Sequence, residues 1–132
     1  MKKIISFFVL FITISGTLLM TASAYWSDSY KISFMAMVST YTMDHGIPGV
    51  PKITSDAYAE FQGGYITSWS RPSARLVNSE KESRSAWVEL KDEHIYPTTQ
   101  VTAVKNHYYY AEVKGAWNQL LVDSMRFRYN PY

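Results

Sequence analysis

Asn106-His-Tyr-Tyr-Tyr-Ala-Glu-Val-Lys-Gly115 is the stretch of this chain from which an all-β fold is predicted. Alternate residues sort into two sets, His107, Tyr109, Ala111 and Val113 against Tyr108, Tyr110, Glu112 and Lys114. A period of two with consecutive tyrosines favours a β-strand that has one buried face and one solvated face. Such a strand belongs to an antiparallel sheet, whose apolar face needs a second layer to cover it.

The rest of the chain divides into short alternating segments separated by turns. We expect strands at 30–38, 53–62, 73–78, 85–91, 98–105, 106–115 and 124–129, with a further short segment at 65–70. A loop is expected at 44–51, which holds two glycines and two prolines, and a turn at 92–97. About seven strands at this spacing are typical of an antiparallel β-sandwich, Ig-like or Greek-key. The strand at Tyr108 to Val113 is expected to be central, and the expected core contains Ala86, Val88, Leu90, Ala111, Val113 and Phe127.

Residues 1–24 have the pattern of a secretory signal peptide. Lys2 and Lys3 precede an apolar run, and Ala22-Ser-Ala24 supplies a small-residue cleavage site. A retained membrane anchor would need about 20 predominantly apolar residues, and the polar cluster between Thr13 and Thr17 argues against one. The sequence therefore predicts a secreted bacterial protein without a stable membrane span, whose single domain covers residues 25–132.

Charge and cysteine content exclude several classes of function. Removal of the signal leaves 13 − 2 = 11 basic residues against 11 acidic ones, so the mature chain is close to neutral. A neutral chain without a basic cluster predicts no nucleic-acid partner. Cysteine is absent, which excludes disulfides, thiol nucleophiles and thiolate metal sites.

Signals for catalysis are weak. His45, His94 and His107 stand alone in their segments, and no serine lies in a G-x-S-x-G elbow. Asp92, Glu93 and His94 are adjacent rather than spaced as in a calcium loop, so a charged turn is the preferred interpretation. We therefore expect a non-enzymatic protein with no cofactor and no metal.

Aromatic and arginine side chains are the candidate ligand-binding residues. Trp87, Tyr108 and Tyr110 fall on the solvent side of their expected strands, and Trp69 and Trp117 lie at strand ends. If the strands are neighbours, the three rings on the solvent side form one patch suited to a cell-wall component or an envelope surface. The alternative is that a loop or the segment Tyr25-Trp26 covers these rings, which then form a second small core.

Arg126 and Arg128 fall on one face of the last expected strand. Two guanidinium groups about 7 Å apart could grip a phosphate or a carboxylate. The alternative is an edge strand whose charges prevent edge-to-edge pairing, and it is the preferred interpretation from the sequence.

Part of the chain resembles the lactococcin-type secreted bacteriocins. The matching elements are Asp56-Ala-Tyr-Ala-Glu-Phe61, Ser73-Ala-Arg-Leu-Val-Asn78, the polar turn that follows, Ser85-Ala-Trp-Val-Glu-Leu90 and the run of tyrosines. They span about half of the mature chain. The resemblance implies a secreted, disulfide-free sandwich that acts on cell-wall synthesis through a wall precursor. It transfers no binding residue.

Three functions remain open from the sequence. The first is a secreted non-enzymatic β-sandwich that binds a cell-envelope or extracellular ligand. The second is a bacteriocin-like antibacterial toxin that acts on cell-wall synthesis, and the third is a small secreted hydrolase.

Overall fold

A computed structural model describes residues 25–34, 39–41, 48–64, 71–115 and 123–132. Several sequence predictions lie outside these residues. They are the signal peptide at 1–24, the end of the first expected strand at 35–38, the segment 65–70, and the residues His45, Trp69 and Trp117.

The described residues form β-strands and turns, with no helix among them, which confirms the all-β prediction. Nine strands are present among the described residues, two more than expected. The additional strands are β2 and β3, and β3 shows that the expected loop at 44–51 is wrong at its last two residues, which pair with β8. The strands are β1 (Tyr30–Phe34), β2 (Ser39–Tyr41), β3 (Val50–Pro51), β4 (Ala59–Gly64), β5 (Ser73–Val77), β6 (Val88–Glu89), β7 (Ile95–Thr98), β8 (Tyr108–Lys114) and β9 (Asp123–Asn130).

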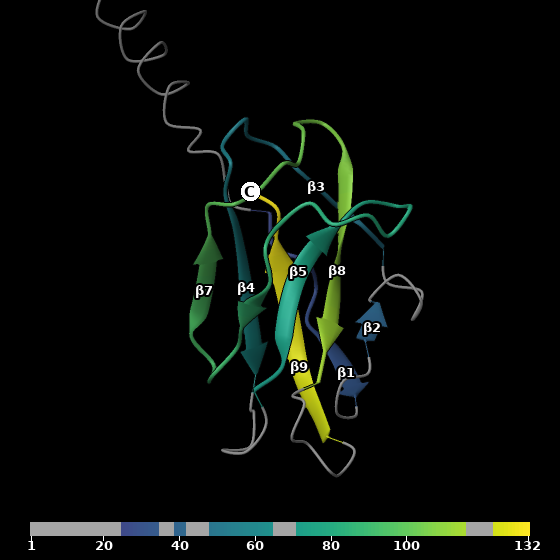
Figure 1. The fold of residues 1–132 in the computed structure, drawn as a ribbon, viewed down its shortest axis with the longest axis vertical. Coiled ribbons are helices and arrows are strands. Elements are labelled where there is room, and N and C mark those ends of the chain that lie inside the picture. Colours follow the sequence, from purple (N-terminus) through teal and green to yellow (C-terminus); the bar gives the residue numbers. More distant parts are fainter. Residues whose placement is uncertain (1–24, 35–38, 42–47, 65–70, 116–122) are drawn as a thin grey trace, which may run out of the picture.

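These strands pair into two antiparallel sheets. One sheet has the order β1-β9-β4-β7, and the other has the order β2-β8-β5-β6, with β3 also paired to β8. In Figure 1, β5 and β8 lie side by side at the front, and β9 passes behind them. The tyrosine strand β8 has partners on both edges, so its predicted central position is confirmed.

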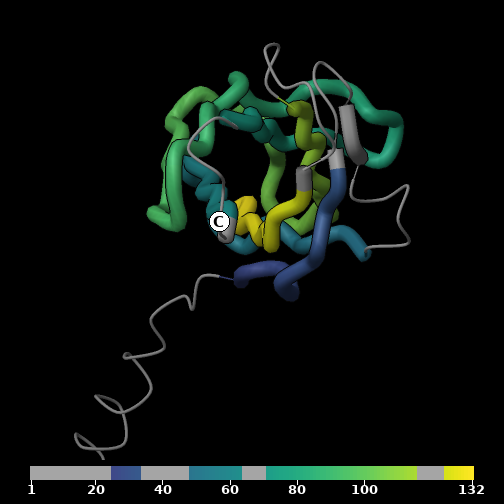
Figure 2. The backbone as a smooth tube through the Cα atoms, turned by 90° about the horizontal axis from the view of Figure 1, so that it is seen from below, coloured from purple at the N-terminus to yellow at the C-terminus, as the bar shows by residue number. Residues whose placement is uncertain are grey.

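Both sheets contribute side chains to one hydrophobic core. The strands run round a central space (Figure 2), and the core cluster includes Phe61 and Phe127 from one sheet and Leu76 and Val113 from the other. The Tyr129 hydroxyl donates a hydrogen bond to the Tyr109 carbonyl at 3.0 Å, which links β9 to β8 through the interior.

Most of the predicted core is confirmed. Leu90, Ala111, Val113 and Phe127 have no exposed surface. Val88 is partly buried against the core, and Ala86 is half-buried. The alternation in β8 is also confirmed on its inner face by Tyr109, Ala111 and Val113.

The expected strand at 85–91 is wrong except at Val88 and Glu89. The Leu76 amide donates a hydrogen bond to the Ser85 hydroxyl at 2.9 Å. In a regular ladder, this amide would donate to a carbonyl of the partner strand. A side chain that takes over a backbone bond in this way interrupts the ladder.

The expected turn at 92–97 and strand at 98–105 are both displaced. A strand, β7, occupies Ile95–Thr98 instead, and its position at the edge of the sheet tolerates Pro97. Farther along, the Tyr109 hydroxyl accepts a hydrogen bond from the Val104 amide at 2.6 Å. That bond holds the segment as a loop, in which only Val101 forms an isolated bridge, with Ser85.

The expected strand at 53–62 begins only at Ala59. Before it, the chain is held by Lys52, which is fully buried and donates from Nζ to the Pro131 carbonyl at 2.8 Å and the Tyr132 carbonyl at 3.2 Å. Burial lowers the pKa of Lys52. The segment is therefore anchored to the chain's last residues rather than to a neighbouring strand.

Candidate functional site

The structure places the predicted site residues in three separate regions. Trp87 lies beside β6, and Tyr108 and Tyr110 lie on β8, with β5 between the two strands. Arg126 and Arg128 belong to β9 in the other sheet. The condition for one continuous aromatic patch, direct pairing of the strands that carry Trp87 and the tyrosines, is therefore not met.

Trp87 is half-buried and engaged by two cations. The Arg75 guanidinium carbon lies 4.5 Å from the ring centroid, and Lys114 Nζ lies 4.2 Å from it. Contacts of this length are cation–π interactions. Part of the ring's negative face is thus already used inside the protein, so Trp87 is a poorer stacking surface for a ligand than its position in the sequence suggested.

An ion pair lies beside Trp87. Arg75 Nε donates to Glu112 Oε2 at 2.6 Å, and the two residues face each other across β5 and β8. The Glu112 side chain is only 3% exposed, against 24% for Arg75. The sequence placed Glu112 on the solvated face of its strand. That prediction is wrong because the arginine and its stacking partner shield the carboxylate.

Tyr108 and Tyr110 border a different depression, which we call the tyrosine hollow. It has a volume of about 440 Å³ and is lined by Asn78, Ser79, Arg84, Thr102, Val104, His107, Tyr108, Tyr109 and Tyr110. Tyr108 is 63% exposed and Val104 is 58% exposed. Both side chains belong to the lining of the hollow, and exposed apolar surface that is grouped and rimmed by polar residues marks an interaction site.

Hydrogen bonds hold both rims of the tyrosine hollow. On one side, the Lys52 amide donates to the His107 carbonyl at 2.9 Å, and the Asn106 amide donates to the Lys52 carbonyl at 2.8 Å. On the other side, Asn78 Oδ1 accepts from the amides of Glu80 and Glu82. A rim ordered in this way can present side chains without a large loss of conformational entropy on binding.

Tyr110 is held in place by a glycine. A Cβ atom on Gly49 would lie 2.9 Å from Tyr110 Cζ, closer than real Cβ atoms approach another heavy atom. The chain before β3 therefore packs directly on the ring, and a larger residue at position 49 would force the ring or the chain to shift. No sequence signal marked this contact, because it joins residues 61 positions apart.

The chemistry of the tyrosine hollow suits a polar ligand with flat apolar faces. Tyr108 offers an exposed ring, while Asn78, Thr102 and Arg84 place amide, hydroxyl and guanidinium groups around it. A sugar ring has this combination of an apolar face and hydrogen-bonding edges, and tyrosine is well suited to contact it.

Arg126 and Arg128 do not protect a sheet edge. Strand β9 pairs with β1 on one side and β4 on the other, so the interpretation as an edge strand is wrong. Trp26 lies against Arg128, with the guanidinium carbon 4.6 Å from the ring centroid. The alternative in which Tyr25-Trp26 covers the rings of Trp87, Tyr108 and Tyr110 is therefore wrong for Trp26, which contacts the other sheet.

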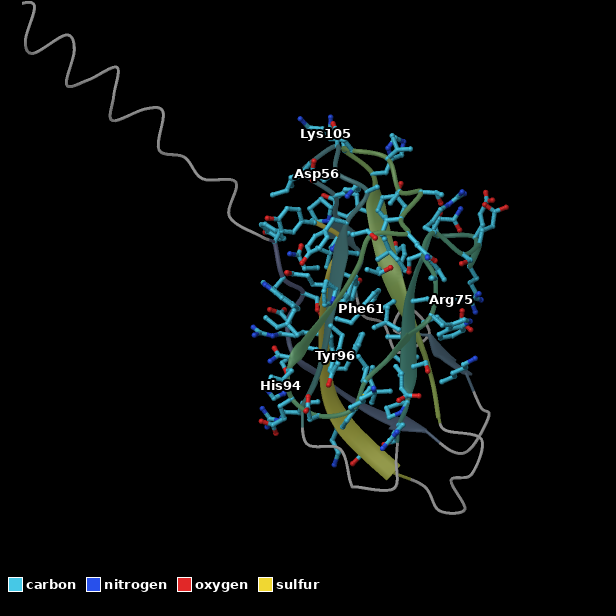
Figure 3. The ribbon with its side chains drawn as sticks, turned by 60° about the vertical axis from the view of Figure 1, so that its left-hand side comes forward. Asp56, Phe61, Arg75, His94, Tyr96 and Lys105 are labelled. Atoms are coloured by element: carbon cyan, nitrogen blue, oxygen red, sulfur yellow. The ribbon has the colours of Figure 1, made fainter. Side chains whose placement is uncertain are left out.

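The Asp92 to His94 segment forms an exposed charged turn. Asp92 Oδ1 accepts from the Tyr96 hydroxyl at 2.7 Å and from the His94 amide at 3.0 Å. These hydrogen bonds lower the pKa of Asp92 to about 2, with the Tyr96 bond the largest cause. Figure 3 shows His94 at one edge of the molecule and Arg75 at the opposite edge. Across the parts of the chain that the structure describes, no three histidine or acidic side chains are grouped to hold a metal ion.

These observations define a cysteine-free protein of two antiparallel sheets, with a polar aromatic hollow on one sheet and a basic face on the other. Searches against protein-family models, curated proteins and solved structures return no match to the chain. No helix in the described ranges is long and apolar enough to cross a membrane.

Proposed function

We propose that this is a secreted, non-enzymatic bacterial protein that binds a cell-envelope or extracellular ligand through the tyrosine hollow. In this proposal residues 25–132 form one β-sandwich domain, Ig-like or Greek-key. The observation that carries the proposal is the 63% exposure of Tyr108 beside a polar depression of about 440 Å³.

Support for a sandwich comes from the core and from the strand orders. Side chains of both sheets share one buried cluster. Strands distant in the sequence are neighbours, as β9 lies between β1 and β4, and β8 lies between β2 and β5. Connections that cross between sheets in this way are typical of Greek-key sandwiches.

Support for binding at the hollow comes from the cost of leaving Tyr108 uncovered. Burial of an aromatic side chain is worth about 1.5–3 kcal/mol, yet this ring stays open on a central strand while Tyr109, its neighbour, is 4% exposed. A ligand that stacks on Tyr108 would recover part of that free energy, and the surrounding polar groups would orient the ligand.

We expect Tyr108→Ser to reduce retention of the purified protein on isolated bacterial cell wall by about tenfold, the equivalent of about 1.4 kcal/mol. The matched control is Ile95→Ser, because Ile95 is 46% exposed on the edge strand β7 and lies outside the hollow. A cosedimentation assay at constant salt measures retention. Equal retention by both variants, with unchanged melting temperatures, would contradict a binding role for the tyrosine hollow.

Processing gives a second prediction. The secreted material should begin at Tyr25, because Ala22-Ser-Ala24 precedes it as a small-residue cleavage site. Intact-mass measurement of protein from the culture medium tests this. Recovery of a stable form that retains residues 1–24, and of no shorter form, would refute the cleavage.

A bacteriocin-like toxin that acts on cell-wall synthesis is the second candidate. The observation that favours it is the placement of the resembling segments, which reach β4, β5 and β8, with β5 and β8 directly paired. A growth-inhibition assay with the purified protein distinguishes the two candidates, since a binder without toxicity would be retained on cell wall and leave growth unchanged.

A further inference from the structure

We propose that the outer face of the four-stranded sheet binds a phosphate group between Arg126 and Arg128. This site is independent of the proposed function, because the tyrosine hollow lies on the other sheet. We call it the arginine face and define it by Lys31, Gln62, Arg126 and Arg128.

Strand pairing brings the charges of the arginine face together. Arg126 and Arg128 are two residues apart on a central strand, so their side chains leave the same face about 7 Å apart. Lys31 is the partner of Arg126 on β1 and adds a third cation. The partner of Arg126 on β4 is Gly64, which has no side chain to cover the guanidinium group.

Arg128 is held in one orientation. Its Nε donates to Gln62 Oε1 at 2.6 Å, and Gln62 Nε2 donates in turn to the Glu93 carbonyl at 2.6 Å. Trp26 stacks on the guanidinium group at 4.6 Å. With Nε engaged and the plane fixed, the Nη groups of Arg128 remain as preorganised donors.

The two arginines of this face are not engaged by carboxylates within the part of the chain that the structure describes. Neither Arg126 nor Arg128 forms an ion pair with a carboxylate of a described residue, whereas Arg71, Arg75 and Arg84 each do. A depression of about 260 Å³ adjoins the two side chains and is lined by Ser29, Gln62, Glu93, Arg126, Phe127 and Arg128. Glu93 is the one acidic residue in that lining, against the two arginines.

The geometry favours phosphate over carboxylate. A carboxylate has two oxygens in one plane and is matched by the fork of a single guanidinium group. A phosphate presents oxygens in tetrahedral directions, so it can accept hydrogen bonds from two guanidinium groups that approach from different positions. Its larger negative charge also offsets more of the repulsion between Arg126, Arg128 and Lys31.

Nuclear magnetic resonance titration of the purified protein with inorganic phosphate, at constant ionic strength, tests the proposal. We expect saturable shifts of the Arg126 and Arg128 Nε–H signals and of the β9 backbone amides. Arg126→Gln and Arg128→Lys should each weaken phosphate affinity by at least about tenfold, the loss of one charge-assisted hydrogen bond. The matched control is Arg71→Gln, because Arg71 is an exposed arginine, 62% exposed, that lies outside the arginine face.

Arg126→Gln should leave folding unchanged, because the Arg126 side chain is exposed and Trp26 packs on Arg128 rather than on Arg126. A loss of phosphate affinity in this variant therefore reports on binding. Titrations with dimethyl phosphate and with acetate test which class of anion the site accepts. Binding of dimethyl phosphate as well as inorganic phosphate would support a site that accepts phosphodiesters, and binding of inorganic phosphate alone would support one for terminal phosphate. Shifts that do not saturate, equal affinity in Arg126→Gln and Arg71→Gln, or acetate binding as tight as phosphate binding would overturn the proposal.

Discussion

Replacement of Glu112 with alanine is expected to lower the free energy of unfolding by about 3 kcal/mol, near the lower end of the range for breaking a buried ion pair. The variant leaves the Arg75 guanidinium without the carboxylate that lies 2.6 Å from its Nε. The lower end applies because the Arg75 side chain is 24% exposed, so water partly solvates the orphaned charge. Urea denaturation monitored by tryptophan fluorescence measures the loss.

Arg84→Gln is the matched control for the Glu112 variant. The Arg84–Glu82 pair has the same separation, 2.6 Å, but its side chains are 33% and 57% exposed. An exposed pair contributes only about 0–1 kcal/mol. The double variant Arg75→Met, Glu112→Leu should regain much of the stability lost in Glu112→Ala, because it removes both charges together. Equal small losses in Glu112→Ala and Arg84→Gln would show that burial does not strengthen this pair.

Leu90→Ala should lower the free energy of unfolding by about 2–5 kcal/mol through lost burial and the cavity left behind. Leu90 has no exposed surface and belongs to the core cluster that both sheets share. Lys91, the next residue, is exposed, so Lys91→Ala should change stability by at most about 0.5 kcal/mol. The same denaturation experiment compares the two variants, and a similar cost for both would mean that residues 90 and 91 are not on opposite sides of the chain.

The fold was predictable where alternating apolar residues in the sequence are also the residues buried in the core. Tyr109, Ala111 and Val113 alternate in the sequence and are buried in the structure. The pattern failed at Ser85, whose hydroxyl takes a backbone hydrogen bond of β5, and at Val104, whose amide is bound by the Tyr109 hydroxyl. Side-chain hydrogen bonds of this kind do not follow a period of two, so alternation cannot reveal them.

The candidate site was predictable only as a set of residue types. Tyr108 was expected to be exposed, and it is. Trp87 was given the same role, yet Arg75 and Lys114 occupy its ring from strands β5 and β8. Whether an aromatic ring can contact a ligand depends on which cations of neighbouring strands stack on it. Strand order decides this, and strand order cannot be read from a local sequence pattern.

Alternation along the chain was enough to predict an all-β chain and the buried positions of Leu90, Val113 and Phe127 in its core. These properties follow from nearest neighbours along the chain, because a strand's two faces are set by residues i and i+2. Strand order required the tertiary structure. The structure places β9 between β1 and β4, so Arg126 and Arg128 lie on the face of a sheet and do not protect an edge. The same strand order places Arg75 of β5 beside Glu112 of β8, and the Glu112 side chain is only 3% exposed. Pairing between strands far apart in the sequence sets which charges meet and which stay exposed, and no local pattern encodes that choice.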